Sequence, residues 1–272
     1  MQGEATTLGF VDVLTPRTLD EALRLKAEQP EAVPIQGGTD VMVELNLDRA
    51  RPPALLNLNE VEEMRGWTRQ NGTVWLGAGL TYTEAMEEPL AELLPALAEA
   101  ARTVGGPQIR NRGTIGGNLG TASPAGDALP PLLVSGTEVK LGSVEGVRWV
   151  ALHEFLVGPK RNILHDDELI LGVSVGTGTA DGRQTFMKIG PRNAMVIAVV
   201  SLAVRVDQEV RAAFGSAGPV PTLVRARLTE IESFPDKVAE AATPIDDVRG
   251  TAAYRRHALR VLTKRALERC LA

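Results

Sequence analysis

The spacing of apolar and polar residues predicts a strand–helix–strand order at the start of the chain. Leucine and alanine at helical spacing between residues 19 and 27 predict a helix, with Thr18 or Asp20 as its N-cap. A second helix is expected to begin at Val41. Short apolar runs bounded by turn residues predict strands at residues 9–14, 32–35 and 54–58.

The pattern changes along the rest of the chain. Asn71-Gly72 predicts the two-residue turn of a hairpin within residues 67–78. Residues 79–101 have a helical pattern, which Pro89 and Pro95 interrupt. Strands dominate beyond residue 138, at 138–141, 146–150, 168–175, 185–189, 195–206 and 208–214. Helices are expected at 224–231 and 249–271.

Composition narrows the function classes. The net charge of −5 and the pI near 5.4 give no attraction to nucleic acid. The apolar runs are too short to span a bilayer, and the N-terminal residues lack signal-peptide features, so no membrane insertion and a cytoplasmic location are expected. Cys270 is the single cysteine, which excludes a disulfide framework, a Cys-ligated zinc site and an iron–sulfur cluster. The three histidines show no ligand spacing. We therefore expect no metal, and an organic cofactor held noncovalently.

A pair of glycines after the strand at 32–35 is the first candidate for binding chemistry. The stretch Pro34 to Val41 reads PIQGGTDV. Two adjacent glycines let backbone N–H groups turn toward an anion without interference from Cβ atoms, and a following helix would favour a phosphate further. A strand-to-helix turn that merely needs glycine explains the segment equally well. The spacing is neither that of a P-loop nor that of the three-glycine dinucleotide fingerprint.

A second glycine pair lies in an unusually long glycine- and proline-rich segment, residues 105–131. Apolar residues inside it favour an ordered loop that wraps a ligand. Thr114 to Asn118 repeats the chemistry of the first loop, and two such loops suit a pyrophosphate held from both sides. Asp127 follows and could accept a hydrogen bond from a sugar hydroxyl, or could simply cap the next helical segment.

Four segments, in the same order, resemble the FAD-binding subunit or domain of the molybdenum hydroxylases, the family of xanthine dehydrogenase and aerobic carbon monoxide dehydrogenase. The main one is GGPQIRNRGTIGGNLGTASPAGDALPPLL, from Gly105 to Leu133. The others are QGGTDVMVEL, FMKIGPRNAMVIAVVSLAV and IDDVRGTAAYRRHALRVLTKRAL. The resemblance covers nearly the whole chain.

The resemblance implies an α+β fold related to vanillyl-alcohol oxidase. It places an FAD-binding domain at residues 1–175, with α/β subdomains at about 1–58 and 59–175. A C-terminal domain of antiparallel strands and helices, 176–272, would cover the flavin, and the composition of residues 176–184 also favours a boundary there.

The resemblance also implies the cofactor and its contacts. Asp127 would hold the ribityl or ribose region, Val104 and Ile170 would flank the adenine, and Lys188 would lie near the isoalloxazine ring. The pyrophosphate contacts would come from Pro34, Ile35, Gln36, Gly37, Gly38, Thr39, Asp40 and Val41, and from Thr114, Ile115, Gly116, Gly117 and Asn118.

Two departures from the family pattern affect the ring site. Many relatives carry two arginines after the lysine, where this chain has Pro191-Arg192-Asn193. Many also carry an acid at the position of Val196. The alternative for Lys188 is a strand-end lysine in solvent.

The function implied is that of an electron-transfer subunit. FAD would take electrons from a 2Fe–2S partner subunit, beside a molybdopterin-binding large subunit, and pass them to an external acceptor. Lys188 would stabilise negative charge on the reduced flavin. Two alternatives remain open at this point: a self-sufficient flavin oxidoreductase of the same fold, and an assembly module that has lost the flavin.

Overall fold

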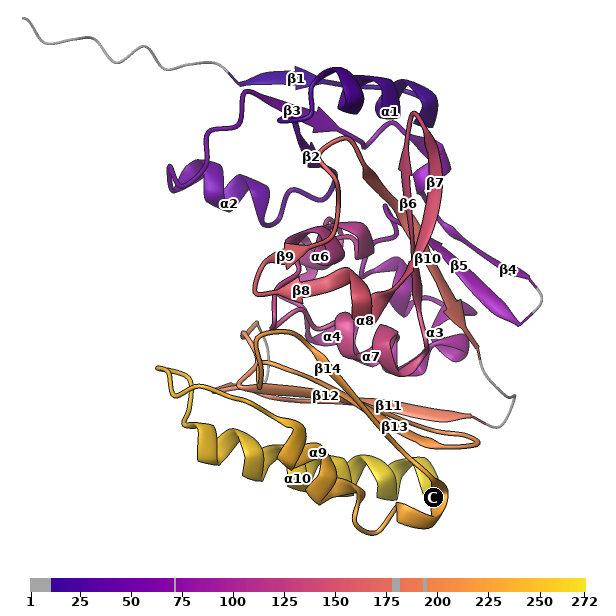
Figure 1. Cartoon of the computed structure of the whole chain (residues 1–272), viewed down its shortest axis with the longest axis vertical. Helices are drawn as coiled ribbons and strands as arrows, with labels where there is room; N and C mark the ends of the chain where they lie inside the picture. The colour runs from indigo at the N-terminus through magenta and orange to yellow at the C-terminus, as the bar shows by residue number, and fades with distance from the viewer. Residues whose placement is uncertain (1–10, 71, 178–181, 193–194) are drawn as a thin grey trace, which may run out of the picture.

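The computed structural model describes residues 11–70, 72–177, 182–192 and 195–272. In these residues, three larger sheets and one two-stranded sheet form, with helices between and below the larger ones (Figure 1). The first sheet is parallel, in the order β1-β3-β2, with β1 at Asp12–Leu14, β2 at Val33–Ile35 and β3 at Ala54–Asn57. Helix α1 (Leu19–Glu28) connects β1 to β2, and the Thr18 hydroxyl caps it by accepting the Glu21 N–H. Helix α2 (Val41–Asn46) follows β2, as the sequence predicts.

The second sheet is antiparallel and has the order β4-β5-β10-β6-β7. Its strands are β4 (Trp67–Gln70), β5 (Thr73–Gly77), β6 (Glu138–Ser143), β7 (Gly146–Ala151) and β10 (Leu169–Gly176). A shorter pair, β8 (Leu156–Gly158) and β9 (Arg161–Asn162), lies beside it. The helical elements around this sheet are η1 (Glu62–Met64), η2 (Glu84–Met86), α3 (Leu90–Leu93), α4 (Pro95–Thr103), α5 (Pro107–Arg110), α6 (Ile115–Thr121), α7 (Leu129–Val134) and α8 (Leu152–Phe155).

The third sheet is an antiparallel meander, β11-β12-β13-β14, formed by Arg183–Ile189, Val200–Val206, Val210–Gly215 and Thr222–Ala226. Helices α9 (Phe234–Ala241) and α10 (Ala252–Leu271) cover one face, and η3 is Leu228–Glu230. Helices α4 and α7 contact the other face, so they lie between the second and third sheets (Figure 1). One hydrophobic core fills the first two sheets and their helices, and another lies between the third sheet and α9 and α10.

Buried polar contacts fix the third sheet to the rest of the chain. Arg205 on β12 is fully buried and donates to the carbonyls of Gly176 and Thr177, at 3.2 and 2.6 Å. Its Nε donates to Asp207 at 3.0 Å. On α4, Glu99 accepts from the Phe186 N–H at 2.7 Å and pairs with an arginine of α10. These contacts hold the third sheet in a defined position against α4 and the end of β10.

Three sequence predictions need correction. Residues 224–231 were expected to be helical, but β14 occupies 222–226 because it pairs with β13, and only the 3₁₀ helix η3 at 228–230 is helical. The strand expected at 195–206 begins only at Val200. The segment 105–131 is ordered but contains α5 and α6 and the start of α7. The turn at Asn71 and parts of the strand at 9–14 and of the boundary at 176–184 lie outside the described residues.

In the described part of the chain, no helix combines the length and the apolar character needed to cross a bilayer.

Candidate functional site

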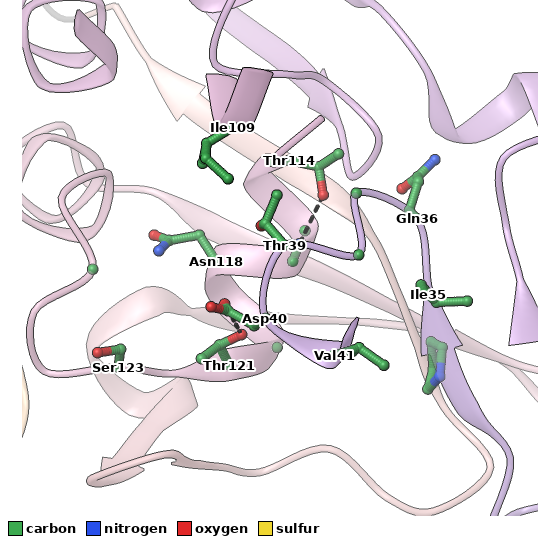
Figure 2. A pocket seen from close by; sticks show the side chains of 18 of the residues that line it. Ile35, Gln36, Thr39, Asp40, Val41, Ile109, Thr114, Asn118, Thr121 and Ser123 are labelled. Carbon is green, nitrogen blue, oxygen red and sulfur yellow. Dashed lines mark hydrogen bonds between the residues drawn. The ribbon is translucent and has the colours of Figure 1, made fainter. Parts of the chain in front are cut away.

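A cavity of about 980 Å³ opens between the two glycine loops, the start of β10 and residues 195–197. Fifteen of the seventeen predicted cofactor residues line it; Ile115 and Lys188 do not. Ile115 is fully buried in the core. Figure 2 shows the first loop, from Gln36 to Val41, running alongside α6, which carries Thr114, Asn118 and Thr121. The sequence therefore identified two loops, 73 or more positions apart, that the fold brings to one cavity.

The first loop, residues 36–40, connects β2 to α2 and keeps its amides free. No hydrogen bond joins the N–H groups of residues 37–41 to any residue that the structure describes. Gly38 has a φ of +73°, which favours glycine. A Cβ on Gly37 would overlap the carbonyl of Arg112, so this glycine permits the close approach of the two loops. A run of free amides beside a cavity is a site for an anion.

Two side chains hold the loops together. Arg112 donates to the carbonyl of Gln36 at 3.0 Å and to the Asn59 side chain at 3.1 Å. The Thr121 hydroxyl, at the end of α6, donates to Asp40 Oδ2 at 2.8 Å (Figure 2). Neither contact was predicted, because each joins residues more than 50 positions apart.

The second loop uses its amides differently. Thr114 caps α6 by accepting the Gly117 N–H at 3.0 Å. The N–H groups of Ile115 and Gly116 donate to the carbonyls of Leu80 and Ala78, at 2.9 and 2.8 Å. Those amides are therefore already paired within the protein, and free amide donors for a phosphate come mainly from the first loop.

The two adjacent glycines of α6 have different surroundings. A Cβ on Gly116 would lie 2.6 Å from the Ala78 Cβ, so this glycine is needed for packing against the end of β5. A Cβ on Gly117 would meet only the Thr114 hydroxyl, at 3.1 Å. Because Gly117 lines the cavity, a side chain there would occupy space that is available to a ligand.

Asp127 and Lys188 form a buried ion pair. Lys188 Nζ on β11 lies 2.5 Å from Asp127 Oδ2, and the side chains are 7% and 8% exposed. Lys188 is therefore not the solvent-exposed lysine of the alternative reading. Asp127 does not cap α7 either, because Ala128 is its N-cap residue and no side-chain cap forms. Burial raises the pKa of the Asp127 carboxyl, whereas the Lys188 ammonium lowers it.

Two residues that line the cavity carry a buried acceptor oxygen without a partner among the described residues: Asp127 Oδ1 and Asn118 Oδ1. Unpaired buried acceptors are costly unless a ligand donates to them. Free amides at one part of the cavity and free acceptors at another suit a molecule that carries both phosphates and hydroxyl groups. The residues present therefore fit a dinucleotide such as FAD.

The apolar residues predicted at the site line different parts of the cavity. Val104 lines the cavity together with Gly105, Gly106 and Ile109. A Cβ built on Gly106 would lie 3.5 Å from Met195 Sδ. Ile170 instead contacts Gly120 on α6. Val196, one of the departures from the family pattern, packs against Gly190 and also lines the cavity. The other departure includes Asn193, which lies outside the described residues.

Two further lining residues were missed by sequence reasoning. Tyr82 is buried with its ring against the second loop. Glu168 accepts from Arg148 at 2.6 and 2.7 Å and from the His165 N–H. The Arg148 hydrogen bond lowers the pKa of Glu168, which burial raises. Tyr82 lies in the segment 79–101 that was predicted to be helical, so no local signal pointed to a binding role.

Comparisons with known proteins identify the family of the chain. Residues 8–177 match the FAD binding domain in molybdopterin dehydrogenase, and residues 185–270 match the CO dehydrogenase flavoprotein C-terminal domain. The xanthine dehydrogenase FAD-binding subunit of Escherichia coli O157:H7 is 30% identical, over 94% of both chains. The nicotinate dehydrogenase FAD-subunit of Eubacterium barkeri is 34% identical, over 72% of this chain and 69% of its own. The solved carbon monoxide dehydrogenase of Hydrogenophaga pseudoflava superposes with a TM-score of 0.87 at 25% identity, covering 96% of each chain.

The fold and the site define an FAD-binding oxidoreductase subunit of α+β architecture. The chain belongs to the family of medium, FAD-binding subunits of the molybdenum hydroxylases, the family of xanthine and carbon monoxide dehydrogenases.

Proposed function

We propose that FAD lies in this cavity with its pyrophosphate against the first glycine loop. The observation that carries the proposal is the run of unpaired amides at residues 37–41, which faces the same cavity as two unpaired buried acceptors. Backbone amides bind phosphoryl oxygens, and carboxylate or amide oxygens accept from hydroxyl groups. Thr114 and Gly117 complete the phosphate region from the side of α6.

The remaining contacts follow from the positions of the lining residues. Asp127 Oδ1 and Asn118 Oδ1 accept from ribityl or ribose hydroxyls. Val104 and Ile170 give apolar contact to the cofactor's rings. Lys188 acts through Asp127, because it pairs with that carboxylate and does not itself line the cavity. It fixes the orientation of Asp127 so that one oxygen is left for the ligand.

The electron path is proposed from the family. The chain takes electrons from a 2Fe–2S partner subunit, in a complex with a molybdopterin-binding large subunit, and delivers them to an external acceptor. When bound, flavin exchanges one or two electrons, so it can join one-electron and two-electron carriers. The names of the relatives, which are subunits and medium chains, support this assembly. Residues 1–175 would form the FAD-binding domain and 176–272 the domain beside it, and the two family matches support that division.

Two measurements test the function. The purified chain or its complex should release FAD on denaturation, identified by chromatography, and release of FMN or NAD alone would overturn the cofactor assignment. Mass spectrometry of the complex, purified through a tag on this chain, should find two partner chains that carry molybdopterin and 2Fe–2S clusters. Substrate turnover by the isolated chain would instead support a self-sufficient oxidoreductase.

A further inference from the structure

Tyr82 is held in the cavity wall by the second glycine loop. Its N–H donates to the carbonyl of Gly113 at 3.1 Å, and Thr81 pairs with Thr114 in an isolated bridge. A Cβ on Gly113 would lie 3.0 Å from two ring carbons, so the ring packs directly on that glycine. The side chain lines the cavity, and the residue is 6% exposed. Backbone and ring together therefore fix the direction of the phenol.

The hydroxyl group has no partner within the described part of the chain. Burial raises the pKa of Tyr82, and the charges of Asp127 and Asp40 raise it further, so the phenol stays protonated at neutral pH. One oxygen of each carboxylate is engaged elsewhere: Asp127 Oδ2 with Lys188, and Asp40 Oδ2 with Thr121. A hydroxyl that carries its proton and bonds to no described residue of the protein is a donor available to a ligand.

The position of the phenol indicates which ligand atom it meets. Its ring touches Gly113, which directly precedes the second loop, and the backbone of Arg112 and Gly113 approaches the first loop at Gly37. Both glycine loops are assigned to the pyrophosphate, so the phenol lies beside the phosphate region. Anionic phosphoryl oxygens accept strong hydrogen bonds from neutral donors.

We infer that Tyr82 is an additional cofactor-binding residue, whose hydroxyl donates a hydrogen bond to a phosphoryl oxygen of the dinucleotide. This inference rests on the proposed binding of FAD in the cavity. It adds a side-chain donor to a phosphate site otherwise built mainly from backbone amides.

The test compares Tyr82→Phe with wild type in the full-length chain after flavin removal, using calorimetric titration with FAD and with adenosine diphosphate. Adenosine diphosphate carries both phosphates but no ribityl or flavin group. We expect both ligands to bind about tenfold more weakly to the variant, equivalent to about 1.4 kcal/mol. The melting temperature of the flavin-free variant should not fall, because phenylalanine keeps the ring and removes only an unpaired hydroxyl.

Tyr254→Phe is the matched control, since Tyr254 is the other tyrosine and is half exposed on α10. It should bind both ligands like wild type. Unchanged affinity in Tyr82→Phe would overturn the inference, and so would weaker FAD binding with unchanged binding of adenosine diphosphate. Wild type that binds neither ligand would refute the proposed function itself, so the two failures are distinguishable.

Discussion

Replacing Lys188 by methionine removes one charge from the buried pair and keeps most of the side-chain volume. With Nζ 2.5 Å from Asp127 Oδ2, Coulomb's law at an effective dielectric constant of about 20 gives an attraction of about 7 kcal/mol. Desolvation of both charges offsets much of this attraction. The measurable consequence is the cost of leaving Asp127 buried without its counter-charge, which is about 3–5 kcal/mol for such pairs.

The cost depends on pH because Asp127 can take up a proton. Burial already raises its pKa, and loss of the ammonium removes the effect that lowers it. When the pKa of a carboxyl is higher in the folded state than in the unfolded state, the group does not lower the free energy of unfolding at pH values below its unfolded-state pKa. Its cost then grows by about 1.4 kcal/mol per pH unit until the pH reaches the folded pKa. The free energy of unfolding of Lys188→Met should therefore be close to that of wild type near pH 4 and fall increasingly below it toward pH 8.

Guanidinium unfolding of the flavin-free, full-length chain across this pH range measures the effect. The double variant Lys188→Met with Asp127→Asn should recover much of the lost stability, because no unpaired charge remains. Lys160→Met is the control, since Lys160 is 67% exposed and pairs with Glu44 only at 3.4 Å; it should cost about 0–1 kcal/mol. A pH-independent loss, or a double variant that loses the sum of the two single changes, would refute the buried ion pair as the cause.

Two further predictions concern the cavity wall. Gly117→Val should weaken FAD binding by about 100-fold or more while the flavin-free chain melts like wild type, because its Cβ meets only the Thr114 hydroxyl. Gly116→Ala should instead lower the stability of the flavin-free chain by about 1–3 kcal/mol, because the added Cβ would contact Ala78. If both variants lose stability equally, the assignment of Gly116 to packing and of Gly117 to ligand space is wrong. Glu168 has a pKa lowered by Arg148, so its contribution to stability is present above the ordinary value of 4.5 and is lost as the pH falls through the folded pKa. Thermal melting below pH 4.5 should show wild type losing stability faster than Glu168→Gln, and parallel pH profiles would contradict this.

The glycine loops could be predicted from the sequence because the residues that define them are adjacent in the chain. Adjacent glycines and a threonine show where backbone can approach a ligand, and no distant residue is needed to recognise them. The sequence does not show what each amide is paired with. The Ile115 and Gly116 amides bond to carbonyls of residues 78 and 80, which requires the packing of α6 against the end of β5. The expectation of two equivalent phosphate loops is therefore replaced by one loop with free amides and one whose amides are largely paired.

The partner of Lys188 was equally hidden, because Asp127 is 61 positions away and only the docking of the third sheet joins them. The helix wrongly expected at 224–231 shows the same limit on a smaller scale. Residues 222–226 form a strand because β13 presents an edge beside them, and this pairing is tertiary information. Periodicity over a short segment cannot supply it.

The first loop, the second loop and the third sheet contribute different groups to the cavity. The first loop can offer unpaired amides because it passes directly from β2 into α2, and among the described residues its N–H groups have no hydrogen-bond acceptor. The second loop is anchored on β5 and provides a rigid wall with Gly117 and Tyr82. The third sheet contributes Lys188, which leaves one oxygen of Asp127 for a ligand hydroxyl. Because the unpaired acceptors and amides are costly without a ligand, a bound dinucleotide should stabilise the first loop and the contact between α7 and the third sheet together.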